Sequence, residues 1–510
     1  MARQVPGTLP TAIVSAAIGI VLAGAGVWAA GPWSGGQRVS ERQVRFTGTG
    51  TPSGTPVAQA SHDSIAPASP SPSVRSTGPT HSPAQAALAP VLAGEKVGGA
   101  LTTAQLAGAL APLTTAAGLG KHVGVAVADP ASSALLFDNR AADGFAPAST
   151  NKVVTAVAAL AALGPDKQFT TRVVQTSGGA ADGASGAAIV LVGGGDPTLS
   201  TQPAPADPAW RPASLDELAA ATADALRAKG VNSVTLGYDA SLFGGPALNP
   251  TWSAGYTDGN VAPVVGLMVD EGRSRPGDEL SPRVPDPAST AASAFAARLT
   301  AHGVKVVGKP TSAPGAGAGT GTGATLAGVS SARLGDLVEH MLTVSDNDLA
   351  EALLRQVALA GGKPATFEGG VAAVREQLGR LGVGLTGLSV LDGSGLSRDD
   401  RISPAFLVSV LSAAAADDHP DLRAALTGLP VAGLTGTLAE DGRYTTPQSS
   451  AGAGLVRAKT GSLTGVVTLA GLVRDNDGQL LVFALMADQA TDTASARAAV
   501  DRIATTLAGM

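Results

Sequence analysis

Cysteine is absent from this 510-residue chain, and charged and aromatic residues are scarce, at 15% and 3%. Without cysteine the chain has no disulfides, no thiolate metal site and no cysteine nucleophile. The six histidines are scattered and show none of the spacings typical of zinc ligands, so we predict no metal site. The net charge is −6, and lysines and arginines form no cluster, which argues against nucleic-acid binding.

The amino-terminal segment carries an uncharged apolar run. No charged side chain lies between Gln4 and Gln37, and residues 11–33 are apolar enough to cross a bilayer, which takes about 20 residues. Such a segment is either a cleaved signal peptide or an uncleaved signal anchor, and its length favours the anchor. We therefore expect residues 1–33 to direct export and to anchor the protein in the cell membrane.

The rest of the chain divides by composition. Residues 34–97 are rich in serine, threonine, proline, glycine and alanine, and such a stretch cannot bury enough apolar surface to fold. We predict a disordered linker there. Apolar residues make up 44% of the chain, which predicts a globular body, and the length predicts two or three domains.

Hydrophobic periodicity predicts both helices and strands in the globular part. Ser149 stands where the N-cap of the first of these helices belongs, and the helical region over 333–360 is interrupted near Ser345. The expected elements are a strand pair over 123–127 and 135–137, helices over 152–163, 333–360 and 495–508, and paired strands over 466–473 and 480–486.

The first of three short motifs is Ser149-Thr150-Asn151-Lys152. A serine hydroxyl is a weak nucleophile until a base takes its proton. A lysine three residues further along a helix lies on the same face. Burial beside a second cation, for which Lys459 is a candidate, would lower the lysine pKa enough for a neutral amine to act as base. The helix amino end also presents N–H groups where an oxyanion would form.

The second motif is Ser345-Asp346-Asn347, at the expected break in the helical region. Ser345 and Asn347 are two positions apart, so both side chains can project together from a loop or a distorted turn. The serine is a candidate proton relay, and the asparagine is a candidate ligand for a substrate amide.

The third motif is Lys459-Thr460-Gly461-Ser462, directly before a predicted strand. Glycine at 461 removes side-chain bulk, so a substrate backbone can lie along this edge. Lys459 and Thr460 would then meet a substrate carboxylate.

Each motif alone has a purely structural interpretation, as a helix cap, a loop serine or a strand residue. Lys152 is nevertheless the only lysine with a serine three positions before it, and Lys459 opens the only K-T-G in the chain. The presence of all three motifs in this order favours catalysis.

With these motifs the chain resembles the class C low-molecular-mass penicillin-binding proteins, D-alanyl-D-alanine carboxypeptidases that often act also as endopeptidases. The resemblance covers roughly residues 98–508. It includes three further segments: GGGDPTL at 193–199, DEGR at 270–273 and DGSGLSR at 392–398. We take Asp196 and the 392–395 segment as structural or rim elements, with glycines that serve turns.

The resemblance implies the fold class α/β (α+β), a penicilloyl-serine transferase domain of the β-lactamase/transpeptidase type. Such a domain has an antiparallel sheet with helices on both faces and is interrupted by inserted accessory domains. Ser345 lies 196 positions after Ser149, more than a compact catalytic domain needs. We therefore predict the catalytic domain over 98–167 and 326–510 and the inserted domains over 168–325, with the Gly/Ala run at 314–324 as a return linker.

The resemblance also implies the catalytic roles. Ser149 would be the acylated nucleophile and Lys152 its base. Ser345 and Lys459 would help to pass the proton to the leaving D-alanine. No metal or cofactor is implied.

The substrate-binding roles follow from the same resemblance. Asn347 would bind the peptide amide and Thr460 the terminal carboxylate. Gly461 would leave room for the substrate backbone. The backbone N–H groups of Ser149 and Ser462 would form the oxyanion hole. The implied partners are peptidoglycan stem peptides ending in D-Ala-D-Ala, and β-lactam antibiotics, which would acylate the same serine.

Two alternatives stay open. A serine β-lactamase needs an efficient deacylating base, to which no glutamate can be assigned from the sequence, and the large insertion also disfavours it. A non-catalytic peptidoglycan-binding module that retains the fold would be expected to have lost a catalytic side chain, and none is missing here.

Overall fold

The computed structural model describes residues 101–176, 187–203, 210–316 and 324–510. The predicted membrane segment, the predicted linker and most of the predicted return linker lie outside the described residues. Of the helices within these ranges, none has the length and the apolar character that crossing a membrane requires.

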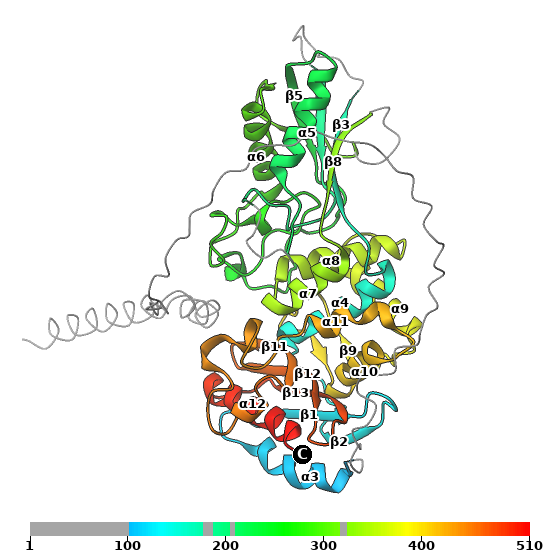
Figure 1. Ribbon diagram of the computed structural model, residues 1–510, viewed down its shortest axis with the longest axis vertical. Coiled ribbons are helices and arrows are strands. Elements are labelled where there is room, and N and C mark those ends of the chain that lie inside the picture. The colour runs from blue at the N-terminus through cyan, green and yellow to red at the C-terminus, as the bar shows by residue number, and fades with distance from the viewer. Residues whose placement is uncertain (1–100, 177–186, 204–209, 317–323) are drawn as a thin grey trace, which may run out of the picture.

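A five-stranded sheet in the order β11-β12-β13-β1-β2 is the centre of the lower lobe in Figure 1. All of its pairings are antiparallel. Strands from the start and the end of the chain therefore lie side by side, and β11 forms one edge. The strands are β1 (Val123–Ala128), β2 (Leu135–Asn139), β11 (Val456–Leu463), β12 (Val466–Arg474) and β13 (Leu480–Ala487).

Helices cover both faces of this sheet, because its strands alternate apolar side chains between two cores. Leu485 packs on one face with α3 (Thr103–Leu110) and α12 (Thr493–Ala508). Ala484 and Met486 pack on the other face. The helices of that second core are α4 (Asn151–Leu163), α7 (Leu334–Val344), α8 (Asn347–Ala360), α9 (Phe367–Arg380), α10 (Pro404–Ala415) and α11 (Ala424–Thr427). The predicted antiparallel sheet with helices on both faces is thus confirmed.

A second sheet lies in the upper lobe and is built from residues 170–330 (Figure 1). Its strands run in the order β6-β5-β4-β3-β8, with β7 beside β5, and mix parallel and antiparallel pairs. Two helices, α5 (Leu215–Ala228) and α6 (Pro287–Ala301), pack on it. The strands are β3 (Thr170–Gln175), β4 (Ala187–Val192), β5 (Ser233–Asp239), β6 (Lys305–Val306), β7 (Thr311–Ser312) and β8 (Thr325–Ser330). The division at 168 and 325 stays a prediction.

The predicted secondary structure agrees with the observed elements, with one correction. The expected break near Ser345 separates α7 from α8. Ser149, however, is not the N-cap of α4. It lies in a 3-10 turn, η2 (Ala148–Thr150), and Thr150 is the cap residue. The chain enters the helix through this extra turn, in which Ala148 has a φ of +47°.

Candidate active site

The 3-10 turn before α4 carries Ser149 and contacts α4 and the strands β11 and β12. Ser149 is 3% exposed. Two glycines from distant segments press against the turn. A side chain at Gly395 would meet the carbonyl oxygen of Ala148, and one at Gly461 would meet that of Pro147. The nucleophile candidate is therefore held by backbone packing from both the 392–395 segment and β11.

Lys152 lies one helical turn after Ser149 and is fully buried. Its Nζ is 3.1 Å from Ser149 Oγ, 2.7 Å from Asn347 Oδ1 and 2.9 Å from the Ser394 carbonyl oxygen. A carbonyl or amide oxygen only accepts, whereas a hydroxyl both donates and accepts. In a neutral amine the two N–H bonds would go to Asn347 and Ser394, and the nitrogen lone pair would face Ser149.

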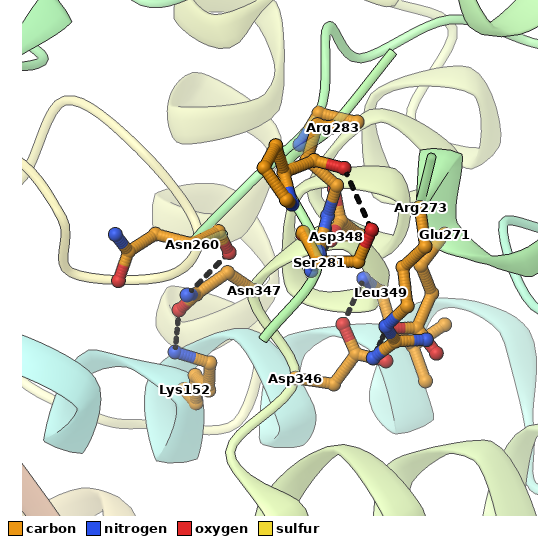
Figure 2. A network of polar contacts seen from close by, with 12 residues as sticks. Lys152, Asn260, Glu271, Arg273, Ser281, Arg283, Asp346, Asn347, Asp348 and Leu349 are labelled. Carbon is orange, nitrogen blue, oxygen red and sulfur yellow. Dashed lines mark hydrogen bonds and ion pairs between the residues drawn. The ribbon is translucent and has the colours of Figure 1, made fainter. Parts of the chain in front are cut away.

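The turn between α7 and α8 brings the second motif to this lysine. Ser345 ends α7 in the left-handed conformation, with a φ of +64°, and lines a cavity of about 420 Å³ together with Asn347. The Asn347 amide nitrogen donates to the Asn260 carbonyl oxygen at 2.9 Å. Figure 2 shows Lys152, Asn347 and Asn260 joined in this chain of hydrogen bonds. The second lobe thus fixes which end of the Asn347 amide faces Lys152.

The segment 392–395 holds a residue that sequence analysis missed. The Glu351 carboxylate, fully buried in α8, accepts from the backbone N–H groups of Gly393 and Ser394 at 2.7–3.1 Å. With its N–H groups held in this way, the 392–395 segment directs the Ser394 carbonyl oxygen to Lys152. Burial, with the nearby charge of Asp392, raises the pKa of Glu351 to about 8. The segment therefore contributes an atom to the site and is more than a rim element.

Strand β11 carries the third motif along the edge of the sheet, next to the Ser149 turn. Lys459 is fully buried, and its Nζ donates to the Thr460 carbonyl at 3.1 Å. The Thr460 hydroxyl lies 2.7 Å from that of Thr437. Ser462 is partly exposed. The structure thus places the third motif beside the first one.

An acidic cluster behind the second motif is the group to consider as a metal site. One ligand atom each of Glu271, His340 and Asp346 lie within 4.8 Å of one another. The Arg273 guanidinium already pairs with Glu271 at 2.5 Å. Burial alone would raise the pKa of Glu271, but the charges of Arg273 and Arg283 outweigh it and lower this pKa. These two arginines supply the positive charge that a metal ion would otherwise provide, so we treat the cluster as an ion-pair network.

Asp346 completes this network from inside the second motif. Its Oδ1 accepts from the backbone N–H of Leu349 at 2.9 Å and so caps α8 (Figure 2). Burial, together with the charges of Glu271 and Asp348, raises the pKa of Asp346 to about 8. Asp346 therefore holds the turn that presents Ser345 and Asn347, and faces away from Lys152.

This geometry joins a serine hydroxyl, a buried amine and the amino end of a helix, which is the equipment for acyl transfer. The sequence profile of the D-Ala-D-Ala carboxypeptidase 3 (S13) family matches residues 106–279 and 273–508. The chain belongs to this family. It is a D-Ala-D-Ala carboxypeptidase, a hydrolase, and the resemblance predicted from the motifs is confirmed.

Two mycobacterial relatives cover most of this S13 carboxypeptidase. The chain is 37% identical to Carboxypeptidase DacB of Mycolicibacterium smegmatis over 412 residues, which are 78% of this chain and 85% of the relative. It is 38% identical to Carboxypeptidase Rv3627c of Mycobacterium tuberculosis over 365 residues, 71% of this chain and 74% of the relative.

Solved structures of a Haemophilus influenzae protein share the fold of this S13 carboxypeptidase. Penicillin binding protein 4 (dacB) superposes with a TM-score of 0.61 and is 24% identical, covering 80% of this chain and 98% of that protein. The same protein complexed with a novel β-lactam superposes with a TM-score of 0.58 at 23% identity, with the same coverage. These matches confirm the predicted fold class.

Proposed function

We propose that this enzyme removes the terminal D-alanine from peptidoglycan stem peptides through an acyl-enzyme on Ser149. The observation that carries the proposal is the 3.1 Å contact between Lys152 Nζ and Ser149 Oγ in a buried site. Asn347 Oδ1 and the Ser394 carbonyl oxygen also accept from this amine, and neither of them can donate a proton to it. The proton that can move is the one between Lys152 and Ser149.

Acylation would begin when Lys152 takes the Ser149 proton and Oγ attacks the carbonyl carbon between the two D-alanines. The backbone N–H groups of Ser149 and Ser462 are the proposed donors to the oxyanion. As the C–N bond breaks, the proton passes through Ser345 and Lys459 to the leaving amine of D-alanine. Water then attacks the ester carbon, the bond between this carbon and Ser149 Oγ breaks, and the water proton passes to Oγ, which restores the free serine.

Substrate binding is assigned to the edge strand and to the second motif. Asn347 would bind the amide of the penultimate residue, and Thr460 the terminal carboxylate. Gly461 supports this placement because a side chain there would meet Thr468, Pro147 and Ala148 within 3.1 Å. Without that side chain, β11 can lie close enough to Ser149 for a peptide to pair along its edge.

β-Lactams are the second proposed ligand of the same serine. The fold of the chain is shared with a penicillin binding protein that was crystallised with a β-lactam. The strained amide would acylate Ser149 in place of the peptide. The enzyme would act outside the cytoplasm, with residues 11–33 as its membrane anchor, which is proposed from their apolar sequence alone.

Mass spectrometry of the protein after incubation with penicillin tests this assignment. We expect one adduct, located by peptide mapping on the peptide that contains Ser149, and no adduct in Ser149→Ala. An adduct on another serine would contradict the proposal. The lifetime of the adduct separates the alternatives, because hydrolysis within seconds indicates a β-lactamase, and no adduct indicates a binding module.

A further inference from the structure

The segment 392–395 turns three successive carbonyl groups towards α4. Those of Asp392 and Gly393 accept from side chains of that helix at 2.9 and 2.7 Å. The third, that of Ser394, accepts from Lys152 Nζ at 2.9 Å. The position of the proposed base therefore depends on how this segment holds its carbonyl groups.

The Asp392 carboxylate holds the other side of the same segment. Its Oδ1 accepts from the Gly395 backbone N–H at 2.7 Å. This N–H and the Ser394 carbonyl belong to one peptide unit, which is planar and trans, so the two groups point in opposite directions. Asp392 therefore fixes the direction of the carbonyl oxygen that contacts Lys152.

Asp392 is the anion in a group of buried carboxyls. It is 1% exposed, and its Oδ2 accepts from the Ser397 N–H and from Trp252 Nε1, both at 2.7 Å. Hydrogen bonds from N–H groups favour the ionised form of a carboxyl. Burial, together with the charge of Asp392, raises the pKa of Glu351 to about 8 and that of Asp400 well above its usual value. These two neighbours are thus largely neutral at neutral pH, and the negative charge lies on Asp392.

We propose that Asp392 is a positioning residue for the general base and acts through the peptide unit that joins Ser394 to Gly395. The inference rests on the proposed roles of Ser149 and Lys152. An anion at the N–H of a peptide unit polarises its carbonyl, which becomes a stronger acceptor. When Lys152 takes the Ser149 proton it becomes a cation, and this carbonyl stabilises the cation. Asp392 itself takes no proton, like the carboxylate that orients the histidine of a serine-protease triad.

The second lobe contributes to this arrangement through its segment 249–252. The indole N–H of Trp252 donates to Asp392, and the Asn249 side chain donates to the Leu391 carbonyl oxygen at 2.7 Å. Two side chains of that lobe therefore hold the residue that positions the base and the residue before it. Removing the indole N–H changes the surroundings of the carboxylate while the carboxylate itself stays in place.

The pH dependence of acylation by a fluorescent penicillin tests the assignment in the full-length enzyme. Acylation should become faster as pH rises and Lys152 loses its proton, and the midpoint of this rise responds to charges near the amine. In Asp392→Asn we expect the plateau rate to fall about ten- to hundredfold, a smaller loss than removal of the base itself would cause. The midpoint should fall by about 0.5–1 pH unit, because the protonated amine loses a stabilising anion.

Trp252→Phe is the second variant, in which the carboxylate keeps its charge but loses one of its donors. The charge of Asp392 is then less compensated, so the midpoint should rise. Altered packing alone would slow acylation without moving the two midpoints in opposite directions. If Asp392→Asn does not fold, Trp252→Phe decides alone: a raised midpoint supports the inference, and an unmoved or lowered midpoint overturns it.

Asp475→Asn is the matched control. Asp475 is also a buried carboxylate that holds a turn, accepting from the N–H groups of Asp477 and Gln479 at 3.0 and 2.7 Å between β12 and β13. This variant should match the parent in rate and midpoint. An unmoved midpoint in Asp392→Asn would overturn the inference even if the rate falls, as would shifts of the same sign in Asp392→Asn and Trp252→Phe. If the parent enzyme is not acylated on Ser149, the proposed function fails instead.

Discussion

Lys152 contacts the Asn347 Oδ1 atom and the Ser394 carbonyl oxygen, both of which can only accept a hydrogen bond. It also contacts Ser149 Oγ, which can donate. The direction of proton transfer thus follows from the chemistry of the neighbours. Asn347 and Ser394 lie 195 and 242 positions further along the chain, so the base is arranged by the fold and not by the local helix.

Replacing Lys152 should therefore slow acylation while Ser149 remains in place. In Lys152→Gln we expect acylation by a fluorescent penicillin to be slower by about 10²- to 10⁴-fold, the range of a lost general base. Rapid-mixing gels measure this rate. Lys305→Gln, which changes an exposed lysine, serves as the control and should match the parent. An unchanged rate in Lys152→Gln would contradict the assignment of the base.

Glu351 makes stability depend on pH. Its pKa is raised from 4.5 to about 8, chiefly by burial. Between these values the folded protein holds a proton that the unfolded chain has released, so the free energy of unfolding falls as pH rises. One group contributes a slope of at most about 1.4 kcal/mol per pH unit. We expect urea unfolding from pH 5 to pH 8 to show a shallower decline in Glu351→Gln. Equal slopes would argue against a proton on Glu351.

At the scale of elements, the site depends on how closely β11 approaches the nucleophile turn. A Cβ at Gly461 would lie 2.7 Å from the Pro147 carbonyl oxygen and 2.1 Å from Thr468 Oγ1. Backbone cannot move aside as a flexible side chain can, so any substitution must push the strand away from η2. Glycine at 461 is thus required by the close packing of β11 against η2.

Gly461→Ala should accordingly lower both stability and acylation. We expect a loss of about 1–3 kcal/mol in the free energy of unfolding, as for other overpacked sites, and a larger proportional loss in acylation rate. Thermal unfolding and penicillin labelling measure the two. Gly379→Ala in α9 is the control, because a Cβ there meets nothing within 4 Å, and it should be neutral or slightly stabilising. Normal labelling in Gly461→Ala would contradict the close approach.

The sequence could predict the helix break at Ser345 and the strand pairs because these have periodic or compositional signals. It could not predict the Ser394 carbonyl as a partner of Lys152, since a backbone atom leaves no residue signature. Glu351 had a weak signal as an acid within an apolar helix. Ser149 was misplaced as an N-cap because the same residue types occur in a 3-10 turn before a helix.

At the scale of the whole molecule, the second lobe is part of the site. Its Arg283 pairs with Asp348 in the second motif's helix at 3.1 Å, and both side chains are almost fully buried. Asp348 also accepts from the Ala262 backbone N–H at 2.6 Å. The lobe that supplies the Asn260 carbonyl is therefore fixed to α8, and Asn347 takes its orientation from both lobes.

Replacing one partner of this ion pair should lower the free energy of unfolding more than replacing both partners. In Arg283→Met we expect about 3–5 kcal/mol lower stability, because the Asp348 charge is left buried and unpaired. The double variant Arg283→Met/Asp348→Leu should recover most of this loss. Denaturant unfolding of the two single variants and the double variant gives the coupling energy. Additive losses would show that the two side chains do not depend on each other.

The central claim is that Ser149 cleaves the bond between two D-alanines. Its most direct test is the release of free D-alanine from a stem peptide ending in D-Ala-D-Ala, by the enzyme and by Ser149→Ala at equal concentration. We predict release by the parent, with an acyl-enzyme on Ser149, and none by the variant. D-Alanine released equally by both proteins would contradict the account.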